Sequence, residues 1–385
     1  MVEWKKLGEF TTHQKAKNKK HVTENAYSIT QAGLIPTKSF FREKTNVTSS
    51  DTSGYYIVEK DWFVYSPSRI DVGSISYLKD EGPVIVSPID VVFSVDKNIC
   101  LPSFLLGYFF TYKGKKDLLK NREGVEGMGR RNLPFESIKD IEIPIPPLSE
   151  QTRIVGILDT FTAAIDNLKE QIALRRKQFE YYRDQLLDLE GKEGVEMIKL
   201  GDVCEKTNNI RWKTESADNT YFYIDLSSVS VDLNQITEAI EICKDNAPSR
   251  AQQIVKTGDI LLGTTRPTLK RYCQVPKQYD NQICSTGYCV FRAKTGIVLN
   301  RWVFHNIGNL KFWDYCEAHQ QGAGYPCLTN SDAFAYTIPV PSLQEQSRLV
   351  SILDTFEESI HNLEAQLEQR EKQYEYYRNK LLTFE

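Results

Sequence analysis

The fold is decided by a stretch that occurs twice, as IPIPPLSEQTRIVGILDTFTAAIDNLKEQIALRRKQFEYYRDQLLDLE at 143–190 and as IPVPSLQEQSRLVSILDTFEESIHNLEAQLEQREKQYEYYRNKLLTFE at 338–385. The two copies align without a gap at an offset of 195 residues, and 27 of their 48 positions are identical. A weaker echo precedes them, EWKKLGE at 3–9 and EMIKLGD at 196–202. The chain is therefore an internal repeat in which a globular part and a repeated segment alternate twice.

Each repeated segment is predicted to be one long helix. Prolines at the start of each copy prevent a helix upstream, and Ser149 is predicted as the N-cap of the first. Apolar residues then recur at alternating steps of four and three, a 3.5-residue period that is typical of a coiled-coil seam. The seams run through Ile154, Leu158, Phe161, Ile165, Leu168, Ile172, Arg175, Phe179, Tyr182, Leu186 and Leu189, and through Leu349, Leu353, Phe356, Ile360, Leu363, Leu367, Arg370, Tyr374, Tyr377, Leu381 and Phe384. The arginine that both seams contain either sets the register or extends toward water.

Two near-identical seams in one chain are expected to pair with each other. If a two-fold axis relates the two globular parts, the helices must run antiparallel. The first seam extends over 35 residue steps from Ile154 to Leu189, or about 52 Å at the helical rise, which would make a rigid strut. The alternative is that separate helices join two chains into a dimer.

The globular parts show many short β-like runs with turn signals, together with short apolar stretches that suggest helices. We predict an α+β fold with two globular domains, two long antiparallel coiled-coil helices and pseudo-two-fold internal symmetry. The expected limits are 1–147 for the first globular domain, 148–192 for the first helix region, 193–342 for the second globular domain and 343–385 for the second helix region. The globular parts differ far more than the helices, which suggests one plan adapted to two targets.

The net charge of −3 is unevenly distributed along the chain. The helical segments carry the excess acid, while the first globular part has a net charge of +3 and the second is neutral. This distribution permits a local phosphate-binding face. The eight cysteines contain no CxxC pair, which favours reduced thiols in a cytoplasmic protein. Neither a secretory signal nor a run of about 18 apolar residues is recognisable, so we expect no membrane contact.

Catalytic motifs are not found in the sequence. There is no phosphate-binding loop of the Walker type and no Asn/Asp-Pro-Pro-aromatic motif of an amino-methyltransferase. A Pro-x-Asp at Pro88–Asp90 lacks the Glu-x-Lys of a nuclease, and the glycine-rich loop Gly124–Gly129 is too short for a dinucleotide site. We therefore predict no catalytic residue and no metal ligand.

The chain resembles the specificity (S) subunit of type I restriction-modification enzymes over essentially its full length. The resemblance is carried by the two Ile-Pro-x-Pro-x-Leu-x-Glu-Gln helix starts at 143–151 and 338–346. Shorter similar motifs are Tyr65-Ser-Pro-Ser-Arg69-Ile-Asp-Val-Gly-Ser-Ile75 in the first globular part, and Gly258-Asp-Ile-Leu-Leu262 and Ser285-Thr-Gly-Tyr288 in the second. The doubled helix start is the most specific of these signals.

The resemblance implies a non-catalytic subunit that recognises a bipartite target in double-stranded DNA. Each globular domain would read one half-site, and the helix pair would set the spacer between them. Two methyltransferase subunits would dock on the helices and supply S-adenosylmethionine and base flipping, and two restriction subunits would add ATP- and Mg²⁺-dependent translocation and cleavage. No cofactor is expected on this chain itself.

Candidate DNA contacts follow from the side chains that suit base edges and phosphates. In the first globular part we predict Arg69 as a base reader beside Tyr65 and Ser68, although Arg69 could equally form a surface ion pair. The further candidates are the basic run Lys15, Lys17, Lys19 and Lys20, the pair Arg130 and Arg131, and in the second part Thr265, Arg266, Lys270, Arg271, Ser285, Thr286, Gln321 and Tyr325. The loop Gln320–Tyr325 occupies the place of Gly127–Asn132 in the first part and is a candidate for insertion into a groove.

Aromatic and basic residues near the end of each helix are predicted to pack or to contact partner proteins rather than to stack on bases. These are Tyr181, Tyr182 and Arg183 in the first helix and Tyr376, Tyr377 and Arg378 in the second. Two other functions remain open. One is a coiled-coil adaptor that binds proteins without touching DNA, and the other is a methyltransferase or nuclease with unrecognised motifs.

Overall fold

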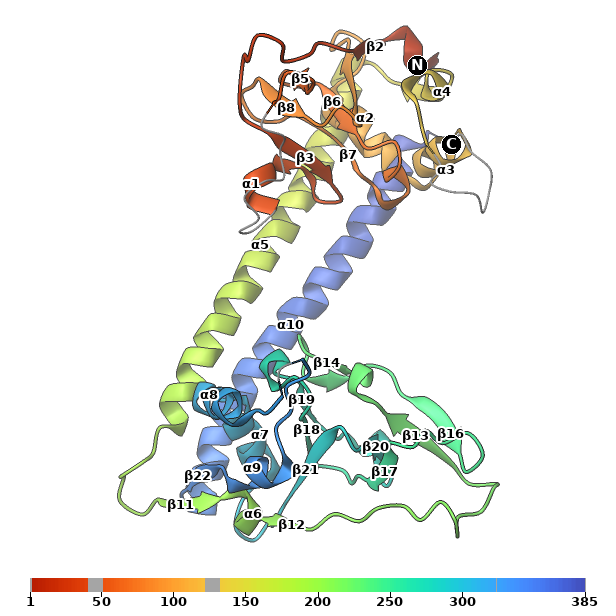
Figure 1. Cartoon of the computed structure of the whole chain (residues 1–385). Helices are drawn as coiled ribbons and strands as arrows, with labels where there is room; N and C mark the ends of the chain where they lie inside the picture. Colours follow the sequence, from red (N-terminus) through yellow and green to blue (C-terminus); the bar gives the residue numbers. More distant parts are fainter. Residues whose placement is uncertain (1, 41–50, 122–131, 323, 385) are drawn as a thin grey trace. The chain divides into compact units, whose positions relative to one another are not determined.

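The computed structural model describes residues 2–40, 51–121, 132–322 and 324–384. The chain divides into two compact units: unit 1 comprises Met1–Lys169 and Ala365–Glu385, and unit 2 comprises Glu170–Glu364. Two helices of 40 residues, α5 (Leu148–Leu187) and α10 (Leu343–Leu382), are each continuous, and each contributes part of its length to both units (Figure 1). The mixed α+β composition and the two long helices predicted from the repeat are thus confirmed.

The ends of α5 differ in detail from the prediction. The helix begins at Leu148, and the carbonyl of Pro147 accepts hydrogen bonds from the amides of Glu150 and Gln151 at 2.8 and 3.0 Å. Ser149 therefore lies inside the first turn, and its prediction as the N-cap is wrong. Leu189, the last predicted seam residue, is buried but lies beyond the end of the helix at Leu187.

Within unit 1, the first half of α5 packs against the second half of α10. The ring of Phe161 stacks on that of Tyr377 with 5.3 Å between centroids, and Lys169 Nζ lies 3.1 Å from a carboxylate oxygen of Glu371. Residue numbers rise along one helix while they fall along the other. The two segments therefore run antiparallel.

Within unit 2, the remaining halves of the same helices make the equivalent contacts. The ring of Tyr182 packs on Phe356 with 5.6 Å between centroids, and Arg176 donates a hydrogen bond of 2.6 Å to Glu364. These residues are the repeat equivalents, at the offset of 195, of those that meet in unit 1. The aromatic pair is the same in both units. The ion pair has opposite signs at equivalent positions, because Lys169 corresponds to Glu364 and Arg176 corresponds to Glu371.

Unit 1 is built on a four-stranded antiparallel sheet in the order β2-β9-β6-β7. Its strands are Thr11–Gln14, Val91–Val95, Phe63–Tyr65 and Ile75–Tyr77. Three two-stranded sheets accompany it: β1 (Glu3–Lys6) with β10 (Glu142–Ile145), β3 (Tyr27–Thr30) with β4 (Gly33–Pro36), and β5 (Tyr56–Val58) with β8 (Val84–Val86). The short helices are α1 (Thr37–Phe40), α2 (Pro102–Phe109), α3 (Tyr112–Lys120) and α4 (Phe135–Ile138).

Unit 2 contains a sheet of the same order, β12-β21-β18-β19, with strands Cys204–Glu205, Tyr288–Ala293, Ile260–Gly263 and Tyr272–Gln274. A second four-stranded sheet, β16-β13-β20-β17, consists of Ile240–Cys243, Thr220–Ile224, Ile283–Ser285 and Ala251–Ile254. The remaining elements are β11 (Glu196–Lys199) paired with β22 (Thr337–Val340), β14 (Val229–Ser230) paired with β15 (Gln235–Ile236), α6 (Leu200–Val203), α7 (Asn300–Gly308), α8 (Leu310–His319) and α9 (Asn330–Ala335). The units therefore share one sheet and differ in the strands added to it.

A buried glutamine joins each long helix to its own globular part. In unit 1, Oε1 of Gln151 accepts a hydrogen bond from the amide of Leu101 at 2.8 Å, and its Nε2 donates to the carbonyls of Ile99 and Pro146 at 2.8 and 2.9 Å. Gln346 makes the same three bonds in unit 2. Both side chains are fully buried. The repeated Glu-Gln of the helix starts thus fixes the helix to the loop that precedes α2 or α7.

Candidate nucleic-acid interface

One loop is closed by the same backbone hydrogen bond in both units. It joins β6 to β7 in unit 1, where the amide of Ser66 donates to the carbonyl of Ser74 at 3.0 Å. In unit 2 it joins β18 to β19, where the amide of Gly263 donates to the carbonyl of Arg271 at 2.8 Å. We call these the arginine loops, 66–74 and 263–271. They correspond residue by residue at an offset of 197.

Each arginine loop contains a single 3₁₀ turn followed by a residue in the left-handed conformation. The turns are Ile70–Val72 and Pro267–Leu269, and the left-handed residues are Gly73, with φ of 82°, and Lys270, with φ of 52°. The amide of each left-handed residue returns to the first carbonyl of its turn, at 3.0 and 2.8 Å. The residue that precedes the turn is Arg69 in unit 1 and Arg266 in unit 2. The two arginines predicted as DNA contacts thus occupy the same position in the two loops, although their backbone conformations differ, with φ of −126° at Arg69 and 52° at Arg266.

In unit 2, the arginine loop is bonded to the segment 324–328. The amide of Arg266 donates to the carbonyl of Pro326 at 2.7 Å, and the amide of Leu328 donates to the carbonyl of Thr264 at 2.9 Å. Thr265 and Gln321 both form β-bridges with Cys327. The structure therefore brings together five of the predicted contact residues of this part: Thr265, Arg266, Lys270, Gln321 and Tyr325.

Arg266 lies over an exposed aromatic ring. Its guanidinium carbon is 4.6 Å from the centroid of Tyr325, whose side chain is 72% exposed. Arg266 itself adopts φ of 52° and ψ of 63°, a left-handed conformation that is uncommon for residues other than glycine. The guanidinium is thus held on a ring at the surface.

Two predicted contacts are wrong because their side chains are fully buried. Tyr65 lies on the central strand β6 and donates its hydroxyl hydrogen bond to the carbonyl of Leu133 at 2.8 Å. Ser285 ends β20, and its Oγ accepts a hydrogen bond from the amide of Gly287. Both side chains belong to the protein interior and cannot reach DNA in this structure.

The other predicted DNA contacts differ in exposure. Arg69, Thr286 and the lysines at 15, 17, 19 and 20 are exposed, whereas Ser68 and Arg271 are half-buried. The Nε atom of Arg271 is buried without a hydrogen-bond partner among the described residues. Arg130 and Arg131 lie outside the described residues.

Among the predicted partner contacts, the four tyrosines at 181, 182, 376 and 377 are exposed on α5 and α10. Arg183 is buried: its guanidinium lies over the ring of Phe179 and pairs with Asp184 at 3.0 Å. The prediction of Arg183 as a partner contact is therefore wrong. Arg378 is half-buried and lies over Tyr374.

Arginines of the long helices are paired, whereas several in the globular parts are not. Every arginine of α5 and α10 has a hydrogen-bond or ion-pair partner within the protein: Arg153, Arg175, Arg176, Arg183, Arg348, Arg370 and Arg378. Over the described ranges, the guanidiniums without such a partner are those of Arg69, Arg211, Arg250, Arg266 and Arg271. Sequence reasoning missed Arg211 and Arg250, because nothing in the neighbouring sequence separates them from ordinary surface arginines.

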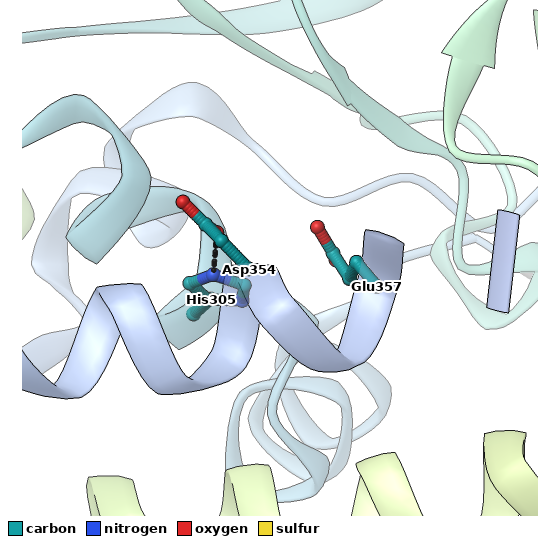
Figure 2. Close-up of side chains that lie close together, drawn as sticks. All are labelled: His305, Asp354 and Glu357. Atoms are coloured by element: carbon teal, nitrogen blue, oxygen red, sulfur yellow. Dashed lines mark hydrogen bonds and ion pairs between the residues drawn. The ribbon is translucent and has the colours of Figure 1, made fainter. Parts of the chain in front are cut away.

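A second cluster of ionisable groups lies inside unit 2. Nε2 of His305 on α7 donates a hydrogen bond of 2.8 Å to the carboxylate of Asp354 on α10, and Glu357 lies one turn further along the same helix (Figure 2). One ligand atom of each residue lies within 4.8 Å of the others, a spacing that could suit a metal ion. The guanidinium of Arg301, however, bonds to both carboxylates. A cation of the protein thus already pairs with both carboxylates, and we assign the cluster to packing of α7 on α10.

Burial and hydrogen bonding together set the pKa values in this cluster. Burial lowers the pKa of His305, although the hydrogen bond to Asp354 acts in the opposite direction. Burial also acts to raise the pKa of Asp354, but the hydrogen bonds from His305 and Arg301 outweigh it and keep that pKa below its usual value. The histidine is therefore held neutral beside a charged carboxylate.

Comparisons with known proteins give concordant results. The family model described as a type I restriction modification DNA specificity domain matches twice, at residues 1–175 and 192–370. A putative type I restriction enzyme specificity subunit of Haemophilus influenzae is 33% identical over 276 residues, which cover 67% of this chain and 68% of that protein. The specificity subunit of the Escherichia coli enzymes EcoR124I and EcoR124II is 28% identical over 100% of this chain and 94% of its own length.

The fold also has a counterpart among solved structures. The S subunit of a type I restriction-modification system from M. genitalium superposes with a TM-score of 0.54 over 100% of this chain and 97% of its own, at 13% identity. That likeness supports the architecture. Among the described helices, none is long and apolar enough to cross a membrane.

Proposed function

Because the chain belongs to the family of type I restriction-modification DNA specificity proteins, we propose that it reads a bipartite sequence in double-stranded DNA, one half with each unit. It is the specificity component of such a system and not a catalytic subunit. Methyl transfer, with S-adenosylmethionine, would belong to two methyltransferase subunits. ATP- and Mg²⁺-dependent cleavage would belong to two restriction subunits.

The observation that carries the proposal is that the two units share a structural frame but differ in the strands added to it. Both units contain a sheet of the same strand order, the same buried glutamine and the same arginine loop. The strands added to that frame differ, since unit 2 has a second four-stranded sheet and unit 1 has two short two-stranded sheets in the corresponding part of its sequence. A shared frame suits two readers of one duplex, and different surfaces suit two different half-sites.

The long helices support the spacer role in this proposal. Each is a continuous helix of 40 residues, about 60 Å at a rise of 1.5 Å per residue. Helices of this length, paired antiparallel, resist bending and would fix the separation of the half-sites. The exposed tyrosines at 181, 182, 376 and 377 offer the same aromatic pair twice, which suits two copies of one docking partner.

The test is to sequence the methylated positions of cell DNA with and without this chain, its methyltransferase partner being present in both. We expect methylation at a two-part motif with an unread spacer, which disappears when the chain is absent. Insertion of seven residues at equivalent places in both helices keeps the 3.5-residue seam and should lengthen the preferred spacer. A motif that persists without the chain would refute the proposal.

A binding assay separates DNA recognition from an adaptor role. Labelled duplexes with and without the motif are titrated at one stated salt concentration, with the chain alone and with its methyltransferase partner. Preference for the motif that depends on the chain supports DNA reading. Assembly with the partner but equal binding to both duplexes would support the adaptor instead.

A further inference from the structure

We infer that Arg69 and Arg266 are the equivalent specificity-determining residues of the two units, and that each reads a guanine from the major groove of its half-site. The inference rests on the proposed function and deepens it, because it names the base and the two side chains. It starts from position: both arginines directly precede the 3₁₀ turn of the same loop, at the offset of 197 that relates the arginine loops. The sequence alignment of the repeat, at an offset of 195, does not include these loops.

Availability is the second argument. Both side chains are exposed, and within the described part of the chain neither guanidinium forms a hydrogen bond or an ion pair with a protein group. The exposed arginines of the helices behave differently; Arg153 and Arg348, for example, bond to Glu150 and Glu345 one turn away. An unpaired guanidinium on a loop retains all five of its donors for an external acceptor.

Orientation is the third argument, and it comes from unit 2. The face of the Arg266 guanidinium packs over the ring of Tyr325, so its donors, which lie in the plane of the group, remain free at the edge. The backbone on both sides is fixed by the bond from the Arg266 amide to Pro326 and by the turn that ends at Lys270. A fixed guanidinium loses less conformational entropy on binding than a mobile one.

The geometry of the donor group indicates the base. Two parallel N–H groups of a guanidinium match O6 and N7 of guanine, which lie side by side on the major-groove edge. Adenine offers a donor and an acceptor there and suits an amide side chain instead. Lys270 is exposed four residues after Arg266, and its place in unit 1 is taken by Gly73. A phosphate contact by this lysine would therefore strengthen the second half-site alone.

The experiment changes one arginine at a time in the full chain, assembled with its methyltransferase partner. R69K and R266K keep the positive charge but lose the two parallel N–H donors of the guanidinium, whereas R69A and R266A lose both the charge and the donors. For R266K, we expect discrimination at one guanine of the second half-site to fall by about 10- to 100-fold, with the first half-site unchanged. R69K should do the same in the first half-site alone.

Two controls make the outcome specific. R348A removes an exposed arginine that is paired to Glu345, and it should leave the methylated motif unchanged. K270A should weaken binding to all duplexes alike. It should also reduce the slope of the logarithm of the binding constant against the logarithm of salt concentration by about one. Far-ultraviolet circular dichroism of each variant checks that it is folded.

Three results would overturn the inference. The first is an R266K or R266A protein that loses affinity equally for all sequences, since that marks a phosphate contact. The second is relaxed specificity at a base pair without guanine, and the third is a change in both half-sites from one substitution. In each of these cases the wild-type protein still reads a two-part motif, so the proposed function stands. The absence of any motif in the wild type is the distinct failure of that proposal.

Discussion

The buried glutamine of unit 2 allows one prediction to be worked in detail. Gln346 is fully buried and makes three hydrogen bonds of 2.9–3.0 Å, accepting from the amide of Leu299 and donating to the carbonyls of Ile297 and Pro341. Gln346→Ala leaves one donor and two acceptors without these partners. At about 1–3 kcal/mol for each unsatisfied buried group, and with water entering the space left by the side chain, we expect a loss of about 3–5 kcal/mol.

Native-state hydrogen exchange is the suitable assay, because a protein of two units need not unfold in a single step. In Gln346→Ala, amides of unit 2 such as that of Leu299 should exchange faster by an amount that corresponds to this loss. Amides of unit 1 such as that of Leu101 should be unchanged. Gln151→Ala should produce the reverse pattern, because Gln151 makes the same three bonds in unit 1.

The matched control is Gln344→Ala, which removes the same chemical group from an exposed position two residues earlier. It should change stability by no more than about 0.5 kcal/mol. A loss below about 1 kcal/mol for Gln346→Ala, or an equal loss in both units, would show that the glutamine does not fix its helix in the way described.

Two further predictions concern ionic groups. Lys169→Glu places a negative charge opposite Glu371 and should destabilise unit 1 slightly. Adding Glu371→Lys should recover about 0.2–1 kcal/mol, measured as the coupling energy of a double-mutant cycle in urea unfolding. A coupling energy of zero would contradict the pairing. Burial lowers the pKa of His305, so the unfolded chain binds its proton first, below about pH 6.5. The contribution of His305 to stability should therefore be complete above that pH and decline as the pH falls toward the folded-state pKa. When the free energy of unfolding is measured from pH 8 to pH 5, His305→Gln should flatten this decline. An unchanged slope would exclude the histidine as its source.

The sequence predicted the long helices well because their signal is local and periodic. Forty residues without an interior proline, with apolar residues at a 3.5-residue period, have few alternatives to a helix. The duplication added a second, independent copy of the same signal. The helix limits differ from the prediction by one or two residues, at Ser149, Leu189 and Phe384, because the ends of a helix depend on local backbone bonds that the periodic pattern does not include.

Burial in the globular parts could not be read in the same way. Tyr65 and Ser285 sit beside arginine and threonine in motifs that look like surface loops, yet each belongs to a strand whose residues are buried on both faces. Such strands show no alternation of polar and apolar residues. Arg183 was misassigned for a similar reason: the helix pattern shows which face meets α10, but not that its guanidinium is covered by other parts of unit 2.

The equivalence of Arg69 and Arg266 was also hidden from the sequence. Both were predicted as DNA contacts, but from separate arguments, because SPSRIDVGS and GTTRPTLKR share only their arginine at matched positions. The correspondence is recorded in backbone hydrogen bonds and in left-handed residues at 73 and 270. Backbone hydrogen bonds do not specify side chains, and the left-handed position is filled by glycine in one loop and by lysine in the other, so the correspondence is not visible in the sequence.

The reversed ion pairs of the long helices have a consequence for which helices can associate. The first helix carries two cations, Lys169 and Arg176, at the places where the second carries two anions, Glu364 and Glu371. In an antiparallel dimer of identical helices at this register, cation would confront cation, or anion would confront anion. The charges at these positions therefore favour the pairing of α5 with α10 and disfavour the pairing of α5 with a second α5, or of α10 with a second α10. Two copies of the chain would gain no electrostatic attraction from such a contact between identical helices.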